Sequence, residues 1–175
     1  MTAPNIPAGA VLLAERLSPW ETAINGKMSG LLVAKSVDTS RANTATYASD
    51  PHLSVAVAAN AVVDVEVHGL YQAGATGQMK FQFTFPSGGQ MDAASWRYDP
   101  GTDEWAAVVG LPGSSPLQFV TGLIGTGGNV PFTLSATLFN GSNAGSLVLQ
   151  WAQTVSNATA TILRRGTKMR VTSAA

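Results

Sequence analysis

The chain has 175 residues, of which 11% are charged, and its ten basic and ten acidic residues give a formal net charge of zero. Ordinary soluble domains carry about 25% charged residues. Balanced charge argues against nucleic acid as the main partner, and no apolar run approaches the roughly 20 residues that a membrane helix needs. The absence of cysteine excludes disulfides and thiolate metal sites. A surface with so few charges keeps copies apart poorly, so we expect partner chains to cover much of it.

Residues 1–50 differ from the rest of the chain and are expected to form an anchoring arm and a linker. Residues 10–17 have the pattern of a short helix, and a second helix is expected from the capping residue Ser18 to a stop at Gly26. Helices this short need a surface on which to lie. Residues 36–50 are mostly polar, as in a linker or an edge strand. The apolar residues expected to anchor the arm on a partner are Val11, Leu12, Leu13, Leu17, Trp20 and Ile24.

From about residue 52, apolar and polar residues alternate with the period of a half-buried β-strand. Valines alternate with charged residues and histidine in 63–68, and methionine and phenylalanines alternate with polar residues in 78–85. Further strands are expected at 53–57, 117–124, 132–138, 147–151, 161–163 and 169–172, and a hairpin is expected at 96–105. Glycine, proline and asparagine turns separate these strands. Residues 51–175 are therefore predicted to form an all-β, antiparallel β-sandwich of the jelly-roll type.

The residue patterns of enzymes are largely missing. A metal site would require more ligands than the two histidines, His52 and His68, provide. The sequence has no Gly-x-Ser-x-Gly motif, and the glycine-rich stretch 125–128 lacks the Lys-Ser/Thr of a phosphate loop. A carboxylate pair for sugar hydrolysis could come from a turn-rich segment, where a solvated loop is the commoner explanation; its acidic residues are Asp92, Asp99, Asp103 and Glu104. We therefore expect no catalytic residues, no cofactor and no metal.

Three aromatic residues near the expected hairpin could bind sugars. Trp96, Tyr98 and Trp105 would offer ring faces on which sugar C–H surfaces stack. The competing interpretation, which we favour, is that these rings pack into the sandwich or into a contact between subunits.

Charge is distributed unevenly along the chain. Four of the ten basic residues lie near the C-terminus, and four of the ten acidic residues lie in the turn-rich segment. This asymmetry could produce head-to-tail ion pairs between copies, which fix register more than affinity, or two separate solvated patches. The candidate pairs combine Arg164, Arg165, Lys168 and Arg170 with Asp92, Asp99, Asp103 and Glu104.

The β region resembles a domain that is widespread in virion proteins of actinobacterial tailed phages. Asp50–Leu53 followed by Ser54–Ala61 is similar to the opening of that domain, and Ala144–Gln153 with Ser156–Thr159 is similar to its closing strands. Gly166–Val171 fits its last strand, and the resemblance covers roughly residues 45–173. The resemblance implies a jelly roll of the tumour-necrosis-factor-like kind that forms trimers. Such domains occur in capsid decoration or head-fibre proteins and at the ends of minor tail proteins, and the resemblance supplies no catalytic residues.

These observations together predict a phage virion structural protein, and we expect a capsid decoration (cement) protein on the outer capsid surface. Its partners would be further copies of itself, as a homotrimer, and the major capsid protein. The chain lacks the long coiled-coil or collagen-like stalk of a tail fibre, which favours the capsid over the tail. The alternatives are a minor tail or receptor-binding protein that recognises a host cell-surface glycan, a virion-associated glycan hydrolase using Asp99 or Glu104, and a non-viral carbohydrate-binding module using Trp105.

Overall fold

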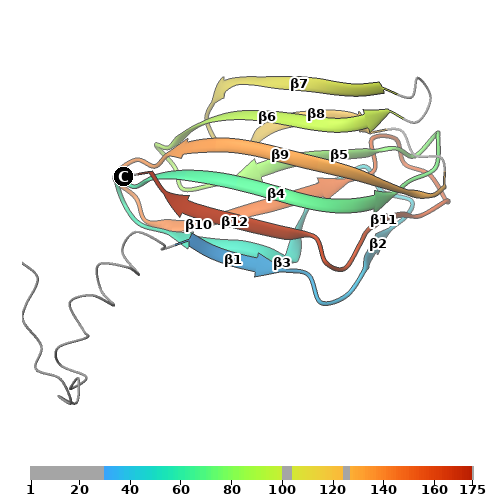
Figure 1. Ribbon diagram of the computed structural model, residues 1–175, viewed down its shortest axis with the longest axis horizontal. Helices are drawn as coiled ribbons and strands as arrows, with labels where there is room; N and C mark the ends of the chain where they lie inside the picture. Colours follow the sequence, from blue (N-terminus) through green and yellow to red (C-terminus); the bar gives the residue numbers. More distant parts are fainter. Residues whose placement is uncertain (1–29, 100–103, 124–126, 175) are drawn as a thin grey trace, which may run out of the picture.

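The computed structural model describes residues 30–99, 104–123 and 127–174, which form two antiparallel β-sheets packed face to face (Figure 1). The described part of the chain contains strands and no helix, which confirms the predicted all-β sandwich. The larger sheet has the spatial order β1 (Gly30–Ala34), β12 (Lys168–Ser173), β4 (Val62–Gln72), β9 (Asn129–Phe139), β6 (Gln90–Asp99) and β7 (Glu104–Gly113), with β2 (Thr39–Arg41) and β11 (Thr161–Leu163) attached beside β4. The smaller sheet has the order β3 (Ala48–Val57), β10 (Gly145–Ala152), β5 (Met79–Thr84) and β8 (Leu117–Leu123).

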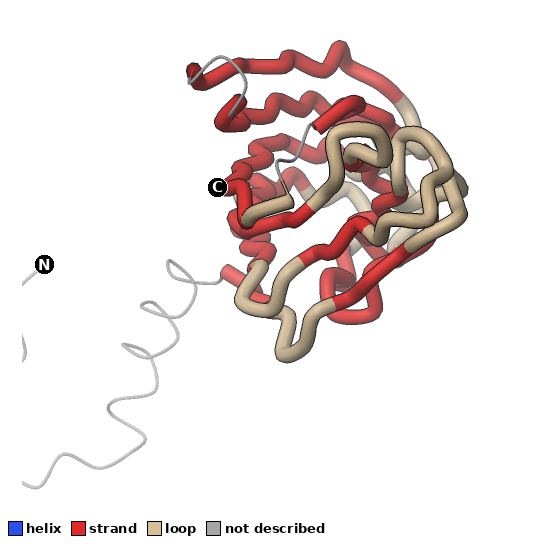
Figure 2. Tube along the Cα trace, turned by 90° about the vertical axis from the view of Figure 1, so that its right-hand side faces the viewer, coloured by secondary structure: helices blue, strands red, loops and turns tan. Residues whose placement is uncertain are grey.

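The connections between the strands are those of a jelly roll. The chain passes from one sheet to the other between β3 and β4, between β4 and β5, between β8 and β9, and between β9 and β10. The β6–β7 hairpin is an excursion from this pattern, because β5 and β8 are paired neighbours and the chain between them leaves to extend the larger sheet beyond β9. Connecting loops gather at the end of the sandwich that faces the viewer in Figure 2.

The core forms between the inward faces of the two sheets. In β4, Val63, Val65 and Val67 are buried, while Asp64 and His68 on the opposite face are exposed, as the alternating pattern predicted. Phenylalanines from both sheets meet in the middle, where Phe81 of β5 stacks on Phe132 of β9 with ring centroids 4.8 Å apart. Trp151 of β10 is completely buried beside them in the same core. Burial of this apolar surface is the main driving force for the fold.

The start of the sandwich differs from the expected domain boundary. The first described residue, Gly30, already belongs to the larger sheet, because β1 pairs with β12 and β2 pairs with β11. The sandwich thus includes residues 30–41, which lie before the boundary expected at residue 51. The sequence did not indicate these strands, because a short edge strand needs few buried residues and so lacks a clear alternation of apolar and polar residues. The two predicted helices and all six expected anchoring residues lie outside the described residues.

Candidate functional site

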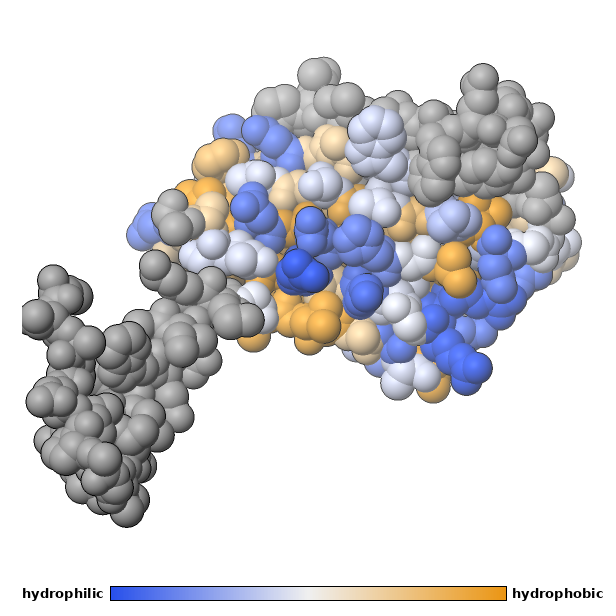
Figure 3. Space-filling model, viewed as in Figure 1, coloured by the Kyte–Doolittle hydropathy of each residue, from blue (hydrophilic) through white to orange (hydrophobic). Residues whose placement is uncertain are grey.

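The edge strand β1 presents apolar side chains on both of its faces. Leu31 is 58% exposed and Leu32 is 61% exposed, and successive residues of a strand point to opposite faces. Within the described residues, β1 pairs with β12 alone, so its other edge is open. Figure 3 shows a hydrophobic patch over β1 beneath a polar surface. An open, apolar edge is typical of a surface that another chain covers.

An apolar groove lies beside β1, where the edges of the two sheets come together. Its volume is about 320 Å³, and Gly30 and Leu31 form part of its wall. Ala58 and Ala61 line it from the turn between β3 and β4, and Val171 lines it from β12. The groove is therefore located at the point where residues 1–29 join the sandwich.

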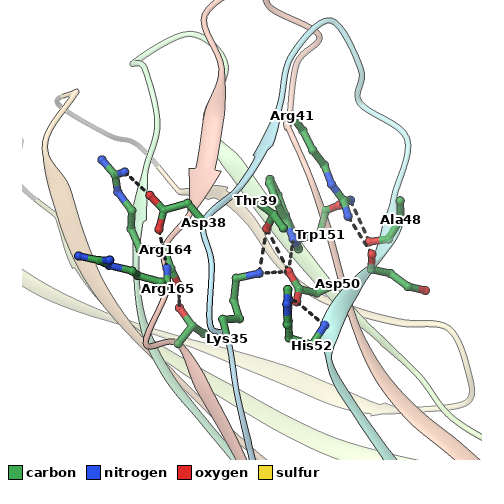
Figure 4. A network of polar contacts seen from close by, with 12 residues as sticks. Lys35, Asp38, Thr39, Arg41, Ala48, Asp50, His52, Trp151, Arg164 and Arg165 are labelled. Atoms are coloured by element: carbon green, nitrogen blue, oxygen red, sulfur yellow. Dashed lines mark hydrogen bonds and ion pairs between the residues drawn. The ribbon is translucent and has the colours of Figure 1, made fainter.

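A buried polar network fixes the end of β1 to the smaller sheet (Figure 4). Lys35 Nζ donates hydrogen bonds to Asp50 Oδ2 at 2.6 Å and to Thr39 Oγ1 at 2.9 Å, and the Lys35 and Asp50 side chains are completely buried. The Trp151 indole donates to Asp50 Oδ2 at 3.1 Å, and the His52 amide donates to Asp50 Oδ1 at 3.0 Å. Burial raises the pKa of Asp50, but these hydrogen bonds and the positive charge of Lys35 together lower it by more, so the pKa lies below its usual range.

Arg41 of β2 adds a second link to the same place. Its guanidinium lies 4.1 Å from the centre of the Trp151 ring, a cation–π contact. The same group donates to the carbonyl oxygens of Ala48 at 2.8 Å and Ser49 at 3.0 Å, and to that of Trp151. β1 and β2 are thus held on the sandwich by charged groups whose hydrogen bonds are satisfied within the chain.

The sequence reasoning missed this network because Lys and Asp are rarely buried. The available signal was the position of Lys35 at the end of an apolar run, which a surface helix or linker would also show. The partner residues are far apart in the chain, and no local pattern joins Lys35 to Trp151.

The outer face of the larger sheet carries a polar belt over β12, β4 and β9. Glu66 lies 3.7 Å from Arg170 and 4.0 Å from His68. His68 Nδ1 is 3.2 Å from Thr133 Oγ1, and the Thr137 hydroxyl donates to Asp64 at 2.9 Å. Exposed apolar side chains flank this belt: Leu32, Trp96 and Phe139. This face therefore combines paired charges, Glu66 with Arg170, with exposed apolar side chains at its margins.

The structure gives Arg164 a partner inside its own chain. Arg164 forms an ion pair with Asp38 at 2.8 Å and donates to Asn129 at 2.8 Å and to Gln72. The Arg165 amide donates to Asp38 Oδ1 at 2.7 Å. This bond and the one from the Arg164 side chain hold the pKa of Asp38 below its usual range. A groove of about 580 Å³ lies at this corner.

The expected acidic partners of these arginines are elsewhere in the fold. Asp92 lies on β6, which β4 and β9 separate from β12 and its exposed Lys168 and Arg170. Asp99 and Glu104 are paired positions at the end of the β6–β7 hairpin, and Asp103 lies outside the described residues. Asp92 therefore does not meet the basic residues of β12 within one chain, and the pairing of the two sets between copies stays a prediction.

The three aromatic positions come together on the β6–β7 hairpin. Tyr98 and Trp105 are directly opposite each other in the two strands, and Trp96 lies two residues before Tyr98 in β6. The Trp96 side chain is 52% exposed. Trp96 therefore does not pack into the sandwich. The two interpretations still open for its ring are a contact between subunits and a platform for sugar binding.

The two histidines lie on different sheets. His52 is on β3, with its Nδ1 3.6 Å from Asp50 Oδ1, and His68 is on β4. No group of three or more His, Asp or Glu residues that could hold a metal ion occurs in residues 30–99, 104–123 and 127–174. The part of the chain that the structure describes also has no helix long and apolar enough to cross a membrane.

Comparisons with known proteins give no family assignment. No protein-family model matches the chain, and no curated protein matches it. Among solved structures, the CBM22-1–GH10 modules of Clostridium thermocellum endo-1,4-beta-D-xylanase 10B, complexed with xylohexaose, match at 12% identity and a TM-score of 0.29, over 81% of this chain and 24% of that chain. The infectious bursal disease virus VP2 subviral particle matches at 12% identity and a TM-score of 0.21, over 81% of this chain and 39% of that chain. The present protein thus covers well under half the length of either matched structure, and neither likeness bears on function.

Proposed function

We propose that this chain is a non-enzymatic structural protein of a phage virion that decorates the outer capsid surface. In this proposal it assembles as a homotrimer and contacts the major capsid protein. The observation that carries the proposal is the open edge strand β1, with Leu31 and Leu32 both more than half exposed on a chain of few charges. The sequence resemblance to virion domains supports the same assignment.

The mechanism is binding linkage. A protein that binds the expanded capsid lattice, but not the unexpanded one, stabilises the expanded form by the free energy of its binding. The jelly roll would supply a rigid body, and the segment 1–29 would supply apolar anchoring residues next to β1. The buried Lys35–Asp50 pair supports this role. It fixes the end of β1, the strand that would transmit a force on residues 1–29 to the core.

The proposal is tested by binding of the full-length protein to capsids. We expect light scattering to give the mass of a trimer. We expect the protein to co-sediment with expanded capsids of its phage but not with unexpanded ones. The double variant Leu31→Asp/Leu32→Asp should lose this binding. Val155→Asp is the matched control, because Val155 is 53% exposed but belongs neither to β1 nor to the groove beside it. A monomeric protein that binds neither expanded nor unexpanded capsids would overturn the proposal.

A second candidate is a tail or receptor-binding protein that recognises a host glycan. The exposure of Trp96 on β6, next to the paired positions Tyr98 and Trp105, favours it. Aromatic faces of this kind bind sugars by stacking. Saturable binding to host cell-wall polysaccharide that disappears in Trp96→Ala and survives in Leu31→Asp would move this function ahead of capsid decoration.

A further inference from the structure

We propose that the apolar groove beside β1 holds Trp20 and Ile24 of the same chain. The inference goes beyond the proposed function, because it assigns Trp20 and Ile24 to the chain's own sandwich. The other expected anchoring residues, Val11, Leu12, Leu13 and Leu17, are left for a partner. The groove has a volume of about 320 Å³ and a largely apolar lining.

The groove is built to receive apolar side chains. Its floor includes Val57, Val63 and Val171, which are 5–7% exposed and belong to the hydrophobic core. Its wall includes Leu31, which is 58% exposed and would lose part of that exposed area to an occupant, whereas Leu32 does not line the groove. Each square ångström of apolar surface removed from water contributes about 25 cal/mol, so an occupant with large apolar side chains would be stabilised there.

The position of the preceding chain favours an occupant from the same molecule. Gly30 lines the groove and is also where residues 1–29 enter the sandwich. Ile24 is therefore six residues away, within reach even if the intervening chain spans only part of its maximum of about 3.5 Å per residue. Asn25–Gly26 favours a turn that would bring the chain back over the groove.

The sequence before this turn matches the groove in chemistry. Trp20 and Ile24 are four residues apart, the spacing that places two side chains on one face of a helix. Tethering raises their effective concentration at the groove to the millimolar range, so a contact too weak between separate molecules can form within one. A copy of the segment from a separate, unassembled molecule has no such advantage, and crosslinking distinguishes the same chain from a neighbouring copy.

Cysteine crosslinking tests the inference on the full-length protein, which has no cysteine of its own. The variant Ile24→Cys/Ala58→Cys places one thiol in the segment and one at the exposed rim of the groove. We expect mild oxidation to give an intrachain disulfide, seen by peptide mapping as a linked pair at the mass of a single chain. Ile24→Cys/Val155→Cys is the matched control and should give several-fold less, because Val155 lies beyond the other end of β10.

Disulfides between different chains, or equal yields in the two cysteine pairs, would overturn the inference. Hydrogen exchange supplies a second measurement that does not depend on engineered thiols. In Trp20→Ala/Ile24→Ala, the amides of residues 56–63 should exchange several-fold faster than in wild type, while Val11→Ala/Leu12→Ala should leave them unchanged. Unaltered exchange in the first variant would also overturn it. Neither measurement uses capsids, so a failure here is distinct from a failure of the proposed function.

Discussion

Lys35 and Asp50 form an ion pair with a 2.6 Å contact and no solvent-exposed side-chain surface on either residue. Lys35 follows β1 in the larger sheet, and Asp50 lies in β3 of the smaller sheet, so the pair joins the two layers at one edge of the sandwich. A buried ion pair contributes little net stability compared with an apolar pair, but the loss of one partner leaves a buried charge without compensation. The position of β1 therefore depends on both residues being present.

We predict that Lys35→Met destabilises the protein by about 3–5 kcal/mol, because it leaves the Asp50 carboxylate buried without its cation. The measurement is the free energy of unfolding from a denaturant titration. Lys35→Met/Asp50→Asn should recover much of the loss, since asparagine is uncharged and still accepts the hydrogen bond from Trp151. Lys168→Met, at an exposed lysine, should change stability by less than about 0.5 kcal/mol. Equal effects of the two lysine substitutions would contradict the buried pairing.

The pH dependence of stability should report the lowered pKa of Asp50. An unfolded Asp has a pKa of about 3.9, and the folded value is lower, so the unfolded chain binds more protons between the two. The contribution of Asp50 to stability is thus complete above about pH 4 to 5 and is lost as the pH falls through the folded pKa. The wild-type protein should lose stability over this range relative to Lys35→Met/Asp50→Asn, and parallel stability curves would show that Asp50 does not titrate as proposed.

The sequence predicted the strands that have one face in the core, because their apolar and polar residues alternate along the chain. β4 and β5 each have one face in the core, so valine or phenylalanine at every second position of the sequence was sufficient to identify them. β1 and β2 lacked this signal, because β1 is largely exposed and β2 has only three residues. Their partners, β12 and β11, lie at the other end of the chain, and such pairing depends on tertiary contacts rather than local pattern.

The candidate sites were harder to predict for a related reason. Counting charges identified a basic and an acidic set, but it did not show that Arg164 would pair with Asp38 and Arg170 with Glu66. The hairpin that carries Trp96, Tyr98 and Trp105 was predicted, because its two strands are close together in the sequence, but a role for these aromatic residues stays a prediction. The groove beside β1 combines residues from β1, β12 and the β3–β4 turn, and only the folded arrangement brings these together.

Gly141 is predicted to be intolerant of a side chain. A Cβ at this position would lie 2.6 Å from the carbonyl oxygen of Gly88 and 2.8 Å from its carbonyl carbon, and a backbone cannot move aside as a flexible side chain can. Gly141→Ala should destabilise the protein by about 1–3 kcal/mol, the usual cost of overpacking, as measured by denaturant unfolding. Gly74→Ala is the control, because its Cβ would make an ordinary contact of 3.5 Å with Thr159. A loss in Gly141→Ala no larger than in Gly74→Ala would contradict the close approach of the two loops.

The salt dependence of assembly should distinguish apolar contacts from ion pairs between copies. Arg164 and Arg170 already have acidic neighbours in their own chain, whereas Leu31 and Leu32 are apolar and exposed. Raising the salt concentration from about 0.1 M to about 1 M shortens the Debye length from about 10 Å to about 3 Å, which weakens exposed ion pairs but not apolar burial. The mass of the full-length assembly from light scattering should therefore stay constant over this range. If instead the assembly dissociates at high salt, head-to-tail pairing between copies becomes the better account, and β1 loses its role as the main contact. That pairing would join the basic residues to Asp92, Asp99, Asp103 and Glu104.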